Sequence, residues 1–330
     1  MKIKKNYLKY IVVLLVTIFL ITAILLFIEK WEKSQNEFSM SGTGNNVIVY
    51  QDQEYVLKDN IESFLVLGLD KYEGSTAADS YESSIQTDFL MLFVFDNDKK
   101  QCSALQISRD TMTQINRLSV GGTHVVDTYT KQIALAYNYV ADDNEKIRCR
   151  NTKDSVEYLL QDVKIDHYLS LTMDAVPLLN DSVGGVEITV LDDFTGIDDT
   201  LVKGETVVLN GEQALRYVRA RQGLEDSTND ARMARQRQYV RALYEKMLSS
   251  QRSDEDFMAQ IVTSLSDYLV YDSSDQKMKE LAEKFDEYEF LGIREIEGET
   301  KLGEEFMEFY PDEDSLQALV IELFYTTVNE

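Results

Sequence analysis

The chain has 330 residues, 44% of them hydrophobic and 10% aromatic, so it can form one large domain or two small ones around a substantial core. It holds 58 acidic and 33 basic residues, which give a formal net charge of −25. This charge argues against nucleic acid as a partner, because proteins bind nucleic acids mainly through basic surfaces.

The N-terminal residues predict a single membrane anchor. Residues 1–10 contain four lysines and no acid, and residues 11–28 contain no charged residue. An uncharged stretch of this length makes a helix that is about long enough to cross a bilayer. The preceding lysines predict a single-pass protein of the cell membrane with a cytoplasmic N-terminus and an extracellular main domain. A cleaved signal peptide is the alternative, but the stretch is long for one and no A-x-A-like site follows it.

The rest of the chain predicts strands that alternate with helices. Residues 29–60 are polar and are expected to form an extracytoplasmic stalk, and residues 70–86 and 97–100 a loop and a turn. Short apolar runs predict strands at residues 63–69, 89–95, 102–107, 168–171, 186–190 and 293–296. Helices are expected at residues 130–140, 152–163, 174–183, 211–219, 230–248, 255–269, 276–285 and 315–328. This order predicts an α/β fold, an α-β-α sandwich around a mixed central sheet, preceded by one transmembrane helix.

Two of these helices carry specific signals. Asn210 and Gln213 have the spacing of a capping box, which predicts the start of the helix at residues 211–219. In the helix at residues 230–248, an apolar stripe and a polar face lie on different sides. The stripe consists of Met233, Val240, Leu243, Tyr244 and Met247, and the other face of Arg232, Arg235, Gln236 and Tyr239.

The cysteines and histidines are few. Cys102 and Cys149 are the only cysteines, and His124 and His167 the only histidines. An oxidising exterior permits a disulfide between the two cysteines, and two free buried thiols are the alternative; both remain open at this point. A zinc site is not expected, because no Cys-x-x-Cys motif occurs.

Arginines gather in one part of the chain. Seven of its thirteen arginines lie between Arg216 and Arg241, a stretch that contains no lysine. The planar fork of arginine binds phosphate oxygens two at a time, which the point charge of lysine cannot do. In a chain with so many carboxylates, this cluster predicts a local site for one anionic ligand.

Aspartates follow or precede three of the predicted strands. Asp70 follows the strand at residues 63–69, Asp88 precedes the next one, and Ser108-Arg109-Asp110-Thr111 follows the third. Ligands of open α/β sheets bind at strand ends, so these groups are expected to meet the arginine cluster. Two aspartates and several arginines suit a pyrophosphate that carries Mg²⁺. Each group alone is more often a cap or a surface ion pair, and it is their joint presence that favours a site.

The chain resembles the LytR-CpsA-Psr family of bacterial cell-envelope glycopolymer transferases. The resemblance covers about residues 61–248 and follows the family's order. The segments that carry it are FLVLGLD (64–70), TDFLMLFVF (87–95), ISRDT (107–111), DHYLSLTMDAVPLLNDSVGGVEITV (166–190), LNGEQALRYVRAR (209–221) and RMARQRQ (232–238).

The resemblance implies a Mg²⁺-dependent phosphotransferase that moves a glycopolymer from a polyprenyl pyrophosphate carrier to a peptidoglycan hydroxyl. The lipid would lie in an apolar tunnel between sheet and helices, residues 61–248 would form the catalytic domain, and residues 249–330 a C-terminal extension packed on it. The implied catalytic residues are Asp88, Arg109 and Asp110, with the general base left open between the two aspartates. Mg²⁺ would be held by Asp70 and Asp88. The pyrophosphate would contact Arg109, Arg219, Arg221, Arg232, Arg235 and Gln236.

Three positions depart from the family's pattern. Gln86 stands where the family usually has arginine, Ser108 where it has proline, and Asn229 where it favours aspartate. The departures at Gln86 and Asn229 keep one alternative open, a non-catalytic envelope protein that binds polyprenyl pyrophosphate precursors or influences wall homeostasis. A second alternative is a polyprenyl pyrophosphatase in which water replaces the acceptor hydroxyl, because it would use the same site.

Overall fold

The computed structural model describes residues 47–71, 85–140, 144–254, 256–274, 276–278, 280 and 287–328. These residues form two compact units, one of residues 47–58 with 325–328 and the other of Asp59–Phe324. The anchor predicted at residues 11–28 lies outside the described residues, as do most of the loop at 70–86 and most of the helix at 276–285. Within the described part of the chain, no helix is both long and apolar enough to cross a membrane.

The smaller unit is a three-stranded antiparallel sheet. It consists of β1 (Val47–Tyr50), β2 (Gln53–Leu57) and β15 (Tyr325–Thr327), with β2 in the middle. Gln51 and Asp52 connect β1 to β2 with φ values of 50° and 63°, the left-handed pair that a tight two-residue hairpin turn requires. Both strands lie in the stretch that was expected to be a polar stalk. The last strand takes the place of the end of the helix predicted at residues 315–328.

The larger unit is built on a six-stranded mixed sheet in the order β11-β8-β3-β4-β5-β12. Three antiparallel strands form its centre, and β8 and β12 pair parallel to β3 and β5. Leu65 and Leu67 on β3 and Leu90 and Leu92 on β4 are fully buried, because both faces of the central strands are covered. The strands are β3 (Ile61–Leu69), β4 (Thr87–Asp96), β5 (Gln101–Ile107), β8 (His167–Thr172), β11 (Leu269–Tyr271) and β12 (Glu289–Glu295).

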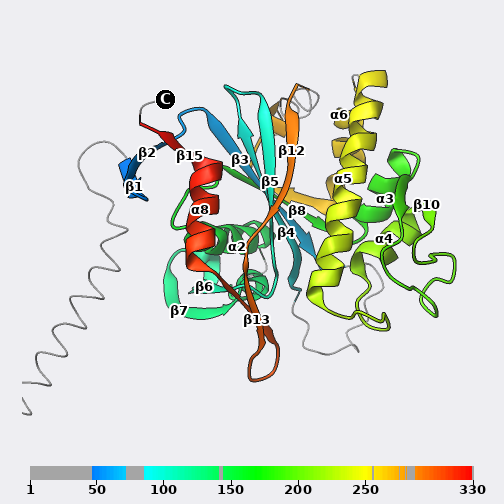
Figure 1. Cartoon of the computed structure of the whole chain (residues 1–330), viewed down its shortest axis with the longest axis horizontal. Helices are drawn as coiled ribbons and strands as arrows, with labels where there is room; N and C mark the ends of the chain where they lie inside the picture. The colour runs from blue at the N-terminus through cyan, green and yellow to red at the C-terminus, as the bar shows by residue number, and fades with distance from the viewer. Residues whose placement is uncertain are drawn as a thin grey trace, which may run out of the picture. The chain divides into compact units, whose positions relative to one another are not determined.

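Helices cover both faces of this sheet (Figure 1). On one side lie α2 (Glu145–Leu159) and α8 (Glu313–Phe324). The other side carries α3 (Ala175–Ser182), α4 (Gly211–Arg219), α5 (Asn229–Ser253) and α6 (Phe257–Ser264). The capping box of Asn210 and Gln213 is present at the start of α4. The predicted α/β class with a mixed central sheet is therefore confirmed.

Two predicted helices are wrong in part. The one at residues 130–140 begins as the end of strand β7 (Val125–Gln132) and continues as a short 3₁₀ helix, Ile133–Asn138. The sequence VVDTYT is rich in β-branched residues, and it pairs with β6 (Met112–Leu118). The one at residues 255–269 ends at Ser264, before a 3₁₀ turn and β11. Two further hairpins complete the unit, β9 (Val186–Thr189) with β10 (Thr206–Leu209) and β13 (Gly298–Leu302) with β14 (Met307–Pro311).

Both cysteines are free, buried thiols. Cys102 lies on β5 and Cys149 in α2, and no disulfide joins them. Burial raises the pKa of each thiol to about 12, because the thiolate would lose its hydration. Of the two possibilities left open by the sequence, the structure contains the free thiols.

Candidate functional site

The predicted site residues meet at one edge of the central sheet. β3 and β4 are antiparallel, so Asp70 at the end of β3 lies beside the start of β4, and its amide donates to the Gln86 carbonyl at 3.0 Å. β5 is antiparallel to β4, so it brings Arg109 and Asp110 to the same edge. The topology therefore assembles the three aspartate-containing groups.

A β-bulge directs Asp88 toward the long helix α5. Gly68 pairs with Phe89 and Leu69 pairs with Thr87, so Asp88 is an extra residue in β4. Such a bulge breaks the strict alternation of side chains and re-aims the extra residue. Phe89 faces the helical layer with α5, and the bulge lets Asp88 reach Arg232 on that helix.

Asp88 is the centre of a buried group of charges. Its Oδ1 accepts from Arg109 Nη1, and its Oδ2 accepts from Arg232 Nη1 at 2.8 Å. The side chains of Asp88, Arg109 and Arg232 are only 7%, 15% and 5% exposed. Burial lowers the pKa of Arg232, and the negative charge of Asp88 opposes this shift. Asp88 alone does not neutralise the two arginines, and Asp110 lies 3.6 Å from Arg109 as a second carboxylate.

Of the three positions that depart from the family's pattern, Gln86 and Asn229 contact this group and Ser108 contacts Asn229. Arg109 Nη2 donates to Gln86 Oε1, and Arg232 Nη2 donates to Asn229 Oδ1 at 2.7 Å. A guanidinium can only donate, so the Asn229 carbonyl must face it, and the Asn229 amide donates to Ser108 Oγ at 3.1 Å. A carboxylate at position 229 would lack this donor. Asn229 and Ser108 are thus partners of one another.

Asp110 occupies a different environment beside the same group. Its Oδ1 accepts from Gln132 Nε2 at 3.1 Å and lies 3.6 Å from Arg109 Nε. Burial raises the pKa of Asp110, while the positive charges of Arg109, Arg232 and Arg221 oppose this shift. Asp110 therefore binds a proton more readily than an ordinary aspartate does.

Arg219 and Arg221 lie on the more open side. Arg219 donates to Asp70 Oδ1 at 3.1 Å, and each of these side chains is about two fifths exposed. Arg221 is half-buried, and within the described part of the chain it has neither a hydrogen-bond nor an ion-pair partner. Its positive charge opposes the rise in the pKa of Asp110, so Arg221 lies near that carboxylate.

The structure does not bring Arg235 into this group. Its side chain is fully buried, with Nε 3.0 Å from Asp192 Oδ2 and the guanidinium stacked 5.4 Å from the centre of the Phe194 ring. Gln236 lies nearer the site, but both atoms of its side-chain amide already form hydrogen bonds. Its Oε1 accepts from Gln106 at 3.2 Å, and its Nε2 donates to the Val218 carbonyl at 3.2 Å.

Several buried donors near the sheet edge have no acceptor among the described residues. They are Thr87 Oγ1, Arg109 Nε, Thr111 Oγ1 and Arg232 Nε. An unsatisfied buried polar group costs roughly 1–3 kcal/mol, so native proteins retain few of them away from ligands or water. The two guanidinium nitrogens belong to the arginines that bind Asp88, so part of the hydrogen-bonding capacity of this group is unused.

An apolar cavity of about 310 Å³ lies between the sheet and α5. It begins at Gly68, Phe89 and Gln236, one helical turn from Arg232, and extends to Cys102 and Tyr288 at the other end of the sheet. A Cβ atom on Gly68 would lie 2.8 Å from Phe89 Cβ, so glycine is required there. The cavity matches the position and apolar character of the tunnel that the sequence predicts.

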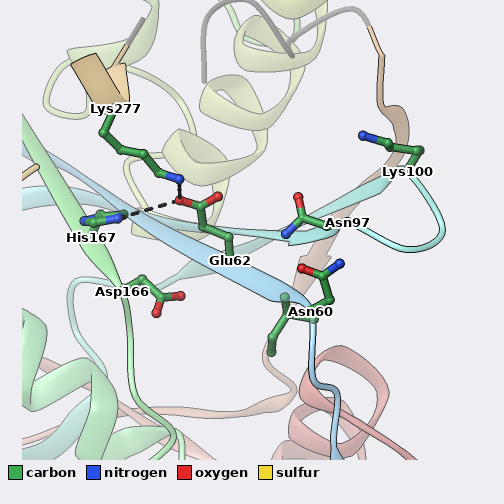
Figure 2. Close-up of a pocket in the computed structure, with 8 residues that line it drawn as sticks. Asn60, Glu62, Asn97, Lys100, Asp166, His167 and Lys277 are labelled. Atoms are coloured by element: carbon green, nitrogen blue, oxygen red, sulfur yellow. Dashed lines mark ion pairs between the residues drawn. The ribbon is translucent and has the colours of Figure 1, made fainter. Parts of the chain in front are cut away.

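A second hollow, of about 550 Å³, lies at the opposite end of β3. Figure 2 shows that Lys277 and His167 both point toward Glu62. Lys277 Nζ lies 2.6 Å from Glu62 Oε1, and His167 Nε2 lies 3.7 Å from the same oxygen. Lys277 pairs with Glu62 and Lys100 with Glu287, so the lysines of this hollow already have anionic partners.

Comparison with known proteins agrees with this arrangement. Residues 25–323 match the model of the LytR_cpsA_psr family. The chain belongs to this family. This LytR-CpsA-Psr protein is 32% identical over 183 residues to the polyisoprenyl-teichoic acid–peptidoglycan teichoic acid transferase TagU of Halalkalibacterium halodurans. The aligned residues cover 55% of the chain and 51% of that relative.

A second relative and a solved structure extend the comparison. The LytR-CpsA-Psr protein is 30% identical over 223 residues to TagU of Enterococcus faecalis, over 67% of the chain and 64% of that relative. The chain therefore spans about half to two thirds of the length of these relatives. The crystal structure of Bacillus subtilis TagV has the same fold, with a TM-score of 0.59 and 24% identity over 81% of the chain and 97% of that structure.

One residue of the site has no signal in the sequence. Gln132 holds the Asp110 carboxylate, but it lies 22 residues away in a stretch that the sequence assigned to a helix. Gln86, Ser108 and Asn229 were identifiable only as departures from the family's pattern, and the sequence did not indicate that they touch the same charged group.

Proposed function

We propose that this LytR-CpsA-Psr protein is a membrane-anchored, Mg²⁺-dependent phosphotransferase that moves a glycopolymer from a polyprenyl pyrophosphate carrier to a peptidoglycan hydroxyl. One observation carries the proposal: four arginines, one more than the three aspartates among them, lie beside an apolar cavity. A lipid pyrophosphate combines these two characters in one molecule. Relatives are named as teichoic acid transferases that act on peptidoglycan, which supports the same class of acceptor.

We assign the pyrophosphate to four arginines. Arg109 and Arg232 donate to Asp88 at the mouth of the cavity. Arg219 and Arg221 lie on the more open side of the same group. The isoprenoid chain would occupy the cavity between the sheet and α5. Arg235 supports the loop around Asp192, and Gln236 supports the cavity wall through its committed amide.

We propose that Asp70 and Asp88 hold Mg²⁺ together with the pyrophosphate. One or two carboxylates are the usual protein ligands of Mg²⁺ when phosphate oxygens and water complete its shell. The described residues contain no cluster of three or more acidic, histidine or cysteine side chains suited to a metal. Both oxygens of Asp88 accept from arginines in this structure, so the ion would have to replace one of these donors. When bound, the ion would supply neutralisation of the phosphate charge.

Asp110 is the general base in this proposal. Both oxygens of Asp88 receive arginine donors, whereas Asp110 has a raised pKa and so a greater affinity for a proton. The acceptor hydroxyl would give its proton to Asp110 as its oxygen bonds to the sugar-side phosphorus. The bond from that phosphorus to the bridging oxygen would break, and polyprenyl phosphate would leave. Arg109 and Arg232 would stabilise the charge that develops on the phosphoryl oxygens.

The proposal includes the location of the site. Residues 11–28 would anchor the protein in the cell membrane with residues 1–10 in the cytoplasm, so that the catalytic domain faces extracellular peptidoglycan. Placement at this surface would let the cavity receive a lipid whose chain starts in the bilayer. A membrane-impermeant, lysine-reactive reagent applied to intact cells should label lysines after the anchor and leave the four lysines before it unlabelled.

The decisive experiment uses the full chain in detergent. A short-chain polyprenyl pyrophosphate glycan and peptidoglycan oligomers are supplied with and without Mg²⁺, and products are followed by mass spectrometry. Transfer to the oligomer that requires Mg²⁺ and is lost in Asp110→Asn supports the proposal. Release of the glycan to water without an acceptor identifies a pyrophosphatase. Tight binding of the donor with no product under any condition identifies a binding protein.

A further inference from the structure

The hairpin of β13 and β14 projects from the same sheet edge as the proposed catalytic group. β12 runs parallel to β5, so both strands end at the edge where Arg109 and Asp110 follow β5. Only two residues separate the end of β12 from the start of β13. Figure 1 shows the hairpin extending beyond the end of β12, away from the sheet.

Three connections tie this hairpin to Asp110. The Phe309 amide donates to the Asp110 carbonyl at 2.8 Å, and Phe309 forms a parallel bridge with Thr111. Gln132 Nε2 donates both to Asp110 Oδ1 at 3.1 Å and to the Met307 carbonyl at 2.7 Å. The side chain of the proposed base and the backbone of the hairpin therefore share one donor. Whatever rests on the hairpin lies next to that base.

The hairpin presents apolar side chains to solvent. Leu302 is 74% exposed, Phe306 49% and Met307 46%. Leu302 and Met307 are directly paired, so they lie on one face of the hairpin, and Phe306 lies in the turn beside them. Residues 298–311 also contain four glutamates and one lysine. An exposed apolar patch with a polar rim marks an interaction surface.

We propose that residues 298–311 bind the glycan acceptor and present its hydroxyl to Asp110; this inference rests on the proposed transferase function. The ring faces of an uncharged sugar are apolar and fit against Leu302, Phe306 and Met307. The excess of glutamates repels anionic lipid headgroups and an anionic donor polymer, so it directs both away from this side. The N-acetylated amino sugar rings of an acceptor strand carry no charge of their own.

The test separates the acceptor from the donor. The triple variant Leu302→Ser/Phe306→Ser/Met307→Ser is compared with Val120→Ser/Val202→Ser, whose wild-type side chains are 78% and 46% exposed on other parts of the surface. Steady-state transfer is measured with peptidoglycan oligomers and a short-chain polyprenyl pyrophosphate glycan. In the hairpin variant we expect the KM for the oligomer to rise about tenfold, which corresponds to about 1.4 kcal/mol. The KM for the donor and the thermal midpoint of the hairpin variant should remain unchanged. The control variant should have the wild-type KM for the oligomer.

Each other outcome has a distinct meaning. An unchanged KM for the oligomer in a hairpin variant that still transfers refutes the acceptor surface and leaves the transferase function standing. A wild-type protein that transfers nothing refutes the transferase function itself. A higher KM for the donor, or weaker binding to vesicles of neutral lipid, would mean that the hairpin inserts into the membrane, which also overturns the inference.

Discussion

The buried pair of Asp88 and Arg232 provides the sharpest test of how the site is held together. Arg232→Met removes the guanidinium and keeps most of the side-chain volume. Breaking a buried ion pair by removing one partner costs about 3–5 kcal/mol, because the other charge stays buried without it. Asp88 retains Arg109, so we expect the lower end of this range, about 3 kcal/mol.

The assay is thermal unfolding of the full chain. For a domain of this size, 1 kcal/mol shifts the midpoint by about 2–4 °C, so Arg232→Met should lower it by about 6–12 °C. Arg241→Met is the matched control, since Arg241 is an exposed arginine on the same helix. Surface substitutions of this kind usually change stability by less than about 0.5 kcal/mol.

A double variant tests the reasoning itself. In Asp88→Asn/Arg232→Met, neither buried charge of the pair remains, so its loss of stability should be smaller than the sum of the two single losses by about 0.5–3 kcal/mol. Additive losses, or an Arg232→Met midpoint equal to that of the wild type, would refute the buried pair as the element that holds the site.

Three further predictions concern the base, the ligand and the cavity. Asp110→Asn should abolish transfer and raise the thermal midpoint at neutral pH. Burial raises the pKa of Asp110 in the folded protein, so ionisation of Asp110 opposes folding as the pH rises through that pKa. A thermal midpoint below that of the wild type at pH 7 would contradict this. Arg219→Ala should abolish binding of inorganic pyrophosphate in calorimetry. The free energy of unfolding should change by less than about 1 kcal/mol, because the ion pair of Arg219 with Asp70 is exposed. Wild-type affinity for pyrophosphate would exclude Arg219 from the site. Val240→Trp should fill part of the apolar cavity and so weaken the binding of a polyprenyl pyrophosphate. The affinity for inorganic pyrophosphate should stay the same. An equal loss of affinity for both ligands would contradict a lipid in the cavity.

The local elements with strong sequence signals were predictable. The central strands were recognisable as apolar runs, and the helix at residues 211–219 by its capping box, because both signals act over a few neighbouring residues. Weaker local signals failed. The end of strand β7, residues 130–132, was predicted as the start of a helix, because the pairing of β7 with β6 is not encoded in its own period.

Of the site, the sequence alone identified the residue types and the sheet edge. Asp70, Asp88, Arg109 and Asp110 follow or precede strands, and topology then brings them together. The contribution of each arginine was not predictable. Arg232 and Arg235 are three residues apart on one helix, yet one reaches Asp88 and the other is buried against Asp192.

The sequence by itself determined the α/β class and the family and predicted an arginine-rich anion site, because periodicity and residue chemistry are local properties. Only the tertiary structure decided which arginines serve that site, which aspartate has a raised pKa, and that Gln132 joins Asp110 to the C-terminal hairpin. These depend on burial and on contacts between residues as far apart as 144 and 175 positions in the chain. Desolvation and ion pairing act through space, so they cannot be derived from neighbours in the sequence.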